Sequence, residues 1–231
     1  VYVRKMMREI IEIGLPIADE ILFTNLFDHR SDMLSWAAIG ARSSEDQEHR
    51  AFASGTSFTV GVKNPTSGSI RIGVNGVVSA QSQHVYVRRN KQIISTGNEY
   101  AHIVLRGGVD GSNYSLRHIK QVAELYKEYD VKNPSVIVDA SHDNTRIDDE
   151  KDYTRQTRAV ESVLKSCKKS KEAKKMVKGF LVESFIKGGS QNLEDVNKSK
   201  VDLGGLSVTD ACIGINETRA LIEKIVQFRK K

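Results

Sequence analysis

Cysteine and proline are both scarce in this chain of 231 residues, which contains two cysteines and three prolines. Neither Cys167 nor Cys212 has a second cysteine at CxxC spacing, so the sequence excludes a disulfide scaffold. We therefore expect free thiols in a reducing cytoplasm. With so few prolines and no low-complexity linker, the sequence shows no domain boundary, and we expect a single domain over residues 1–231.

Long apolar runs are also absent, because no stretch approaches the roughly 18 apolar residues that a membrane-spanning helix requires. The segment from Val1 to Glu9 is charged and helical in pattern, unlike a signal peptide, which is basic and then apolar. The chain has neither a Walker loop nor a GxGxxG motif after a strand. We therefore predict no contact with a membrane and find no motif for nucleotide binding.

The net charge is +6, and part of it comes from a run of lysines. The run consists of Lys165, Lys168, Lys169, Lys171, Lys174, Lys175 and Lys178. Such a run can bind nucleic acid, but no aromatic residues interleave with it to stack on bases. We interpret it as a solvated helix and its exit loop, and predict no nucleic-acid partner. A positive balance also suits a small anionic substrate.

Six short, nearly continuous apolar runs alternate with helical stretches. The runs are Pro16–Leu22, Trp36–Ala41, Phe58–Val62, Ala101–Leu105, Val136–Ala140 and Gly179–Val182. Runs of this kind are typical of strands that are buried on both faces of a parallel sheet. Strands alternating with helices indicate an α/β architecture, and the chain length is close to the roughly 250 residues of a (β/α)₈ barrel.

The helices between these runs have recognisable start signals. The segment Ser44–Gln47 fits a capping box, and the helix that follows it should end near Gly55. Ser115 and Asn216 are candidate caps of two later helices. A longer polar helix is predicted over Asp152–Cys167.

The stretch from Ser69 to Gln92 differs from the rest. Its apolar residues alternate, and it contains two turn-forming pairs, Asn75-Gly76 and Arg89-Asn90. We predict an antiparallel hairpin at about 69–92, inserted between two strand–helix units.

Charged or polar residues follow five of the predicted strands. They are Arg42, Lys63, Arg106, His142 and Glu183. The carboxyl ends of barrel strands meet at one mouth, so these side chains should converge there. Permanent cations next to an imidazole and a carboxylate indicate an anion site beside a metal site. Structural ion pairs could explain any one of these residues, but they explain five strand ends poorly.

The residue types fit this division. Arg42 and Arg106 offer planar forks that match phosphate or carboxylate oxygens, and Lys63 offers a compact cation. His142, Glu183 and Asp210 together form a candidate set for a divalent ion such as Mn²⁺, Fe²⁺, Co²⁺ or Zn²⁺. The three are far apart in sequence, so a structural role for His142 stays open at this point.

Taken in order, the motifs resemble those of the 3-deoxy-D-arabino-heptulosonate 7-phosphate synthases of the microbial type I class. The matching segments are Leu34–Arg42, Ala53–Gly55, Val60–Asn64, His102–Gly108, Asn113–Ser115, Asp139–His142, Val182–Ser184 and Val208–Gly214. The resemblance implies a (β/α)₈ TIM barrel. It also implies condensation of phosphoenolpyruvate with erythrose 4-phosphate, the first step of the shikimate pathway.

The resemblance also implies a role for each site residue. Arg42, Lys63 and Arg106 would hold phosphoenolpyruvate with help from the backbone of Gly40 and Ala41. The metal ligands would be His142, Glu183 and Asp210. The metal would polarise the aldehyde of erythrose 4-phosphate. A homo-oligomer and an aromatic amino acid effector are further expectations.

The chain departs from the family in one respect. About six of the eight barrel strands are present, and we expect the first two to precede Val1. The resemblance implies that those strands carry a cysteine metal ligand and a Lys-Pro-Arg-Thr segment, so we expect this chain alone to lack full activity.

Two other functions stay open. The chain could be a sister synthase that uses arabinose 5-phosphate, or a non-catalytic barrel that acts as a regulatory or assembly partner. The contexts of Arg42 and Arg106 favour the heptulosonate branch. Arg88 lies where the family forms part of its effector site, so the effector is not identified.

Overall fold

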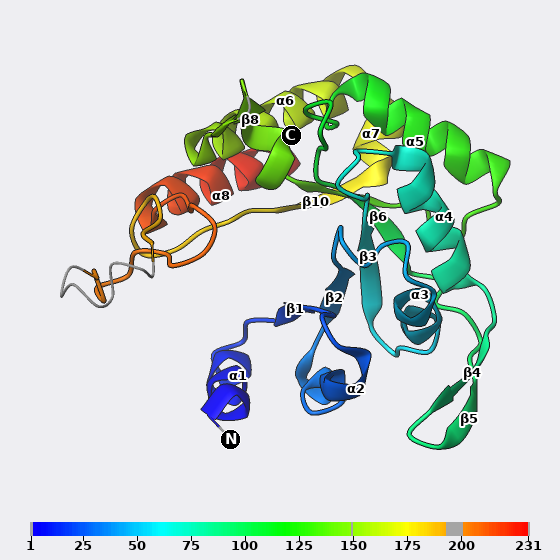
Figure 1. Ribbon diagram of the computed structural model, residues 1–231. Helices are drawn as coiled ribbons and strands as arrows, with labels where there is room; N and C mark the ends of the chain where they lie inside the picture. The colour runs from blue at the N-terminus through cyan, green and yellow to red at the C-terminus, as the bar shows by residue number, and fades with distance from the viewer. Residues whose placement is uncertain (1, 149, 193–200, 231) are drawn as a thin grey trace.

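The computed structural model describes residues 2–148, 150–192 and 201–230. Within these ranges, the centre of the fold is a parallel sheet with strand order β1-β2-β3-β6-β7-β10 (Figure 1). The strands are β1 (Ala18–Glu20), β2 (Trp36–Ile39), β3 (Thr59–Lys63), β6 (His102–Leu105), β7 (Val136–Asp139) and β10 (Val177–Leu181). All six predicted strands are confirmed, each within its expected segment or a few residues from it.

Helices separate these strands in the chain. They are α1 (Tyr2–Glu12), α2 (Thr24–Phe27), α3 (Gln47–Ser54), α4 (Ile70–Gln81), α5 (Leu116–Glu128), α6 (Gln156–Lys169), α7 (Lys171–Met176) and α8 (Ile215–Arg229). Strand residues such as Val62, Ile103 and Leu105 are fully buried in the core formed with α4 and α5. The sheet is curled and its crossovers are helical, so the described residues form part of a (β/α)₈ barrel.

The predicted hairpin at about 69–92 is wrong in its first half. Residues Ile70–Gln81 form α4, which begins where the Ser69 side chain accepts a hydrogen bond from the Ile72 N–H. The pair that we interpreted as a turn lies inside this helix, because Gly76 brings the helix backbone against Val62 of β3. The apolar residues that alternate in sequence also recur at helical spacing, and tertiary packing selects the helix.

The second half of that prediction is confirmed. Strands β4 (Val85–Arg88) and β5 (Lys91–Ile94) form an antiparallel hairpin. Its turn residues, Arg89 and Asn90, both have positive φ, as a two-residue hairpin loop requires. The hairpin projects from the end of the molecule opposite α6 and α8 (Figure 1).

Two predicted helix caps need correction. Asp46, rather than Ser44, caps α3 and accepts a hydrogen bond from the Glu48 N–H, while the Ser44 hydroxyl donates to the Ala41 carbonyl. Helix α8 is preceded by Gly214, so Asn216 lies in its first turn. Ser115 does precede α5, and its hydroxyl contacts His118.

The predicted Asp152–Cys167 helix is present as a short 3₁₀ turn, η3 (Tyr153–Arg155), followed by α6. The lysine run covers the end of α6, helix α7 and the start of β10, and Lys168 and Lys174 lie about 6 Å from the Phe228 ring centroid. Within the described ranges, no helix is long and apolar enough to cross a membrane.

Candidate metal and anion site

Three of the predicted site residues meet beyond the carboxyl ends of β7 and β10. His142 begins the 3₁₀ turn η2 (His142–Thr145) after β7, Glu183 follows β10, and Asp210 lies in the loop before α8. One potential ligand atom from each residue lies within 4.8 Å of the other two. The fold therefore collects an imidazole and two carboxylates from segments that are distant in sequence, as the parallel topology predicts.

Backbone contacts fix the positions of the two carboxylates. The fully buried side chain of Gln156 holds Glu183 by accepting from its N–H at 2.9 Å and donating to its carbonyl at 3.1 Å. The carbonyl of Glu183 also accepts from the Ile213 N–H, which ties the segment that carries Asp210 to the end of β10. The Gln156 side chain thus holds the backbone of Glu183, and a backbone hydrogen bond ties the segment that carries Asp210 to it.

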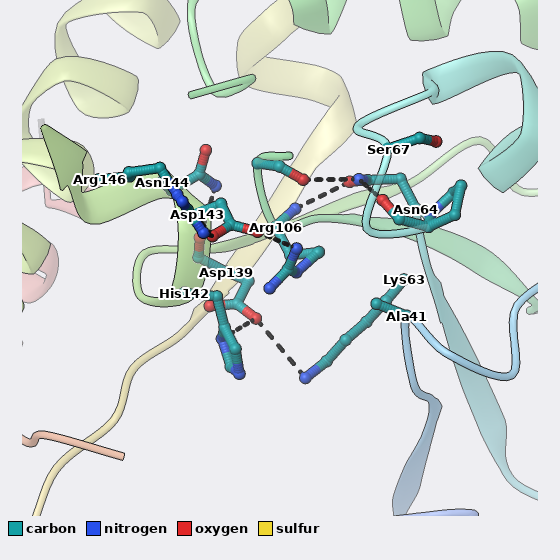
Figure 2. Close-up of polar contacts among 12 residues, drawn as sticks. Ala41, Lys63, Asn64, Ser67, Arg106, Asp139, His142, Asp143, Asn144 and Arg146 are labelled. Carbon is teal, nitrogen blue, oxygen red and sulfur yellow. Dashed lines mark hydrogen bonds and ion pairs between the residues drawn. The ribbon is translucent and has the colours of Figure 1, made fainter. Parts of the chain in front are cut away.

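Asp139 at the end of β7 links the imidazole to a cation. Its carboxylate is fully buried, and its Oδ2 lies 2.9 Å from His142 Nδ1 and 3.6 Å from Lys63 Nζ. Figure 2 shows the side chains of His142 and Lys63 converging on this carboxylate. His142 Nδ1 therefore lies against Asp139, and Nε2 is the nitrogen turned toward Glu183, 3.9 Å away.

The electrostatics of this cluster fit a cation. Burial raises the pKa of the Glu183 carboxyl, and the negative charges of Asp139 and Asp210 raise it further, against the opposing effect of His142 and Lys63. A positive charge bound among these groups would favour the ionised form of Glu183. Oxygen and imidazole donors also suit first-row divalent metals. The described residues therefore fit a divalent ion coordinated by His142, Glu183 and Asp210.

Arg106, which follows β6, is almost fully buried and contacts Asp143 of η2. Its Nη1 forms an ion pair with Asp143 Oδ2, and Asp143 Oδ1 accepts from Arg146 Nε at 3.1 Å and Nη2 at 2.7 Å. Burial acts to raise the pKa of Asp143, but Arg146 and Arg106 hold it below its usual value. Asp143 is therefore an ionised carboxylate between two guanidinium groups.

A network of buried amides holds the loops around Arg106. The side-chain Oδ1 of Asn64 accepts from the Arg106 backbone N–H and from Asn113 Nδ2, and Asn64 Nδ2 donates to the Gly107 backbone carbonyl. Asn144 Nδ2 donates to the carbonyls of Leu105 and Asp139, which joins the ends of β6 and β7. These buried polar groups satisfy one another, and such networks make a site rigid.

The end of β2 supplies the remaining predicted residues. Gly40 is buried, and a Cβ at this position would collide with the carboxylate of Glu20 at the end of β1. That carboxylate lies 3.4 Å from Lys63 Nζ. Arg42 is exposed, and among the described residues it has no recorded ion pair. The structure therefore connects Lys63 to the carboxylates of Glu20 and Asp139 and pairs Arg106 with Asp143, while Arg42 stays exposed.

Sequence reasoning missed Asp139, Asp143 and Gln156 as parts of this site. Asp139 could have been found, because it is a charged residue near the end of the predicted strand Val136–Ala140, three residues before His142. Asp143 and Gln156 carry no comparable signal. Each acts through a contact to a residue at least 27 positions away, which only the fold reveals.

The sequence matches one protein family and several of its characterised members. Residues 3–223 match the DAHP synthetase I family. The Tyr-sensitive phospho-2-dehydro-3-deoxyheptonate aldolase of Escherichia coli K12 is 38% identical over 229 residues, which cover 97% of this chain and 61% of the relative. The phospho-2-dehydro-3-deoxyheptonate aldolase of Corynebacterium glutamicum is 35% identical over 232 residues, which cover 96% of this chain and 60% of the relative.

A solved structure agrees with these relatives. The phospho-2-dehydro-3-deoxyheptonate aldolase of Francisella tularensis SCHU S4 superimposes with a TM-score of 0.87 at 31% identity, covering 97% of this chain and 64% of that one. The chain thus spans about 60% of the length of the curated relatives it matches.

Proposed function

The chain belongs to the DAHP synthetase I family, and we propose that its site serves the condensation of phosphoenolpyruvate with D-erythrose 4-phosphate. The products would be 3-deoxy-D-arabino-heptulosonate 7-phosphate and inorganic phosphate, in the first step of the shikimate pathway. The observation that carries this proposal is the arrangement at the carboxyl ends of the strands. There the imidazole and carboxylates of His142, Glu183 and Asp210 lie beside the buried cations Lys63 and Arg106.

In this proposal, the cations bind phosphoenolpyruvate. Lys63 and Arg106 are each less than a tenth exposed, so their attraction for phosphate and carboxylate oxygens is screened less than it would be in open water. Arg42 would add a fork from the exposed margin, and the backbone N–H groups near Gly40 and Ala41 would contact the same ligand. A trianionic ligand matches three permanent cations in charge.

The metal ligands in this proposal are His142, Glu183 and Asp210, which would hold Mn²⁺, Fe²⁺, Co²⁺ or Zn²⁺. Such an ion acts as a Lewis acid that polarises the aldehyde carbonyl. Asp139 would hold the proton of His142 on Nδ1 and so keep the Nε2 lone pair available. Gln156 would keep Glu183 in place through its backbone.

The reaction requires a new carbon–carbon bond between the phosphoenolpyruvate methylene and the aldehyde carbon. Water adds at C2, and the phosphate group leaves with its bridging oxygen. Negative charge moves from the enol phosphate toward the aldehyde oxygen and the departing phosphate during these steps. Lys63 and Arg106 would stabilise that charge without moving, because buried carboxylates and amides already fix their positions.

Three further expectations belong to the same proposal. We expect a homo-oligomer and a cytoplasmic location, the latter because Cys167 and Cys212 are free thiols. We also expect an aromatic amino acid effector, since the E. coli relative is described as Tyr-sensitive. The hairpin residue Arg88, at the position of the family's effector site, lies 4.5 Å from the Phe52 ring centroid and pairs with Asp28.

Calorimetric titration with phosphoenolpyruvate in the presence of Mn²⁺ tests the proposal. We expect saturable binding that weakens in Lys63→Ala and is unchanged in Lys165→Ala, which removes an equal charge from the surface of α6. Equal binding in both variants would contradict the assignment. Titration with each sugar phosphate in the presence of phosphoenolpyruvate then separates the two synthase types, because erythrose 4-phosphate and not arabinose 5-phosphate should bind.

A further inference from the structure

Asp143 occupies an unusual position beside the proposed anion site. It is 4% exposed and directly follows His142, yet its carboxylate turns away from the metal cluster to pair with Arg106 on one oxygen and Arg146 on the other. The three charges sum to +1. Asp143 therefore does not act on Arg106 alone, because its second oxygen pairs with Arg146.

Not every N–H donor of the Arg106 guanidinium has a hydrogen-bond partner among the described residues. Asp143 accepts from Nη1, but Nε is buried and has no hydrogen-bond partner among the described residues. A buried donor without a partner is costly, which indicates that a ligand completes it. Figure 2 shows the guanidinium extending from Asp143 toward the space between His142 and Lys63.

The backbone under Asp143 is itself fixed. Gly107, which follows Arg106, has a positive φ of 78°, and a Cβ at this position would lie 2.5 Å from the carbonyl carbon of Asp143. Asn144 anchors the same turn to β6 and β7 through the carbonyls of Leu105 and Asp139. The carboxylate of Asp143 is thus held by a rigid turn, as positioning of a second side chain requires.

We propose that Asp143 is a positioning residue for Arg106, one that turns the buried guanidinium so that its remaining N–H groups face a bound phosphate or carboxylate. Arg146 anchors the second oxygen of Asp143 and keeps the local charge positive. The inference rests on the proposed function for the identity of the anion, phosphoenolpyruvate.

A purely electrostatic role for Asp143 predicts the opposite change in anion affinity when Asp143 is replaced. If Asp143 only reduced the positive charge at the site, Asp143→Asn would bind anions more tightly. In the positioning account the variant binds less tightly, because an asparagine amide cannot accept from both arginines and its NH₂ group repels one of them. The sign of the change therefore separates the two roles.

Calorimetry of phosphoenolpyruvate and of Mn²⁺ tests the proposal with the full chain. We expect Asp143→Asn to weaken phosphoenolpyruvate binding by about 10- to 100-fold, the effect of losing a charged hydrogen bond, and to leave Mn²⁺ affinity nearly unchanged. Asp148→Asn, which removes an exposed negative charge nearby, should change neither. Arg146→Gln is a milder second variant, expected to weaken binding in the same direction. Unchanged or tighter binding in both Asp143→Asn and Arg146→Gln overturns the proposal.

A double variant shows whether Asp143 acts through Arg106. In an Arg106→Lys background, adding Asp143→Asn should have little further effect on phosphoenolpyruvate affinity, since lysine lacks the fork that Asp143 orients. An undiminished second loss overturns the proposal.

The ligand-free protein gives a readout that does not depend on the proposed function. The Arg106 Nε–H signal in a ¹H–¹⁵N spectrum should broaden or shift in Asp143→Asn and stay unchanged in Asp148→Asn. An unchanged Arg106 signal in Asp143→Asn contradicts positioning. If phosphoenolpyruvate fails to bind the unmodified chain while this signal responds, the proposed function fails and the positioning contact stands.

Discussion

The buried carboxylate of Asp139 lies 2.9 Å from Nδ1 of His142. This close contact places Nδ1 against Asp139 and leaves Nε2 as the nitrogen on the side of Glu183, 3.9 Å away. The same oxygen lies 3.6 Å from Lys63 Nζ. One residue therefore connects the candidate metal ligands with the candidate anion site.

Replacing Asp139 by asparagine should weaken metal binding without removing a ligand. The amide no longer supplies the negative charge that faces His142 and Lys63. Its NH₂ group must also replace either the oxygen beside them or the oxygen that accepts from the Ser141 N–H. We expect Mn²⁺ affinity to fall by about 10- to 100-fold by calorimetry. Asp110→Asn, in an exposed loop, is the control and should bind Mn²⁺ as the unmodified chain does. Equal affinities in the two variants would refute this role.

Gly107→Ala should destabilise the fold more than Gly111→Ala. Both glycines have positive φ, so an alanine is strained at either position, at about 1–3 kcal/mol. At Gly107, however, the added Cβ would also lie within 2.6 Å of the Asn144 backbone nitrogen, whereas nothing lies within 4 Å at Gly111. Urea unfolding should show the larger loss of unfolding free energy for Gly107→Ala. A larger loss for Gly111→Ala would show that the packing of Gly107 on η2 is unimportant.

His102 should make the fold less stable in mild acid. Burial lowers the pKa of this imidazole below 6.5, against a smaller opposing effect of its hydrogen bond to the Tyr100 carbonyl. The neutral ring satisfies both nitrogens, because Nδ1 donates to Tyr100 and Nε2 accepts from the Trp36 indole at 3.0 Å. Below about pH 6.5 the unfolded chain binds the proton more readily than the folded chain does, so stability decreases as the pH falls.

The matching measurement compares unfolding free energies at about pH 7.5 and about pH 5. The decrease should be smaller in His102→Gln, whose amide oxygen still accepts from Trp36. His29→Gln is the control, because His29 is exposed. If His102→Gln and the unmodified chain lose the same stability, His102 does not contribute to the acid response.

The sequence predicted the strands well because each is buried on both faces, which leaves a nearly continuous apolar run such as Val60–Val62. It predicted α4 poorly for a physical reason. The Ser69–Gln81 segment has two glycines and apolar residues whose spacing fits both a strand and a helix, and local preference cannot choose between them. Packing of Gly73 and Gly76 against β3 and the neighbouring strands makes that choice.

The residues of the candidate site were likewise only partly predictable from the sequence. His142, Glu183 and Lys63 could be predicted because strand ends in a parallel sheet converge, whatever the details of the loops. Asp143 could not, because it reaches Arg106 only through the shape of a short 3₁₀ turn. Arg42 was predicted as one of three cations of the anion site, and its exposed position could not be read from the sequence.

Binding of Mn²⁺ to the chain and to His142→Ala, measured by calorimetry, tests the central claim most directly. The account predicts saturable binding to the unmodified chain at one site, its loss in His142→Ala, and its retention in His118→Ala, which alters a histidine on α5. Mn²⁺ binding of the same affinity in His142→Ala and in the unmodified chain would contradict the account.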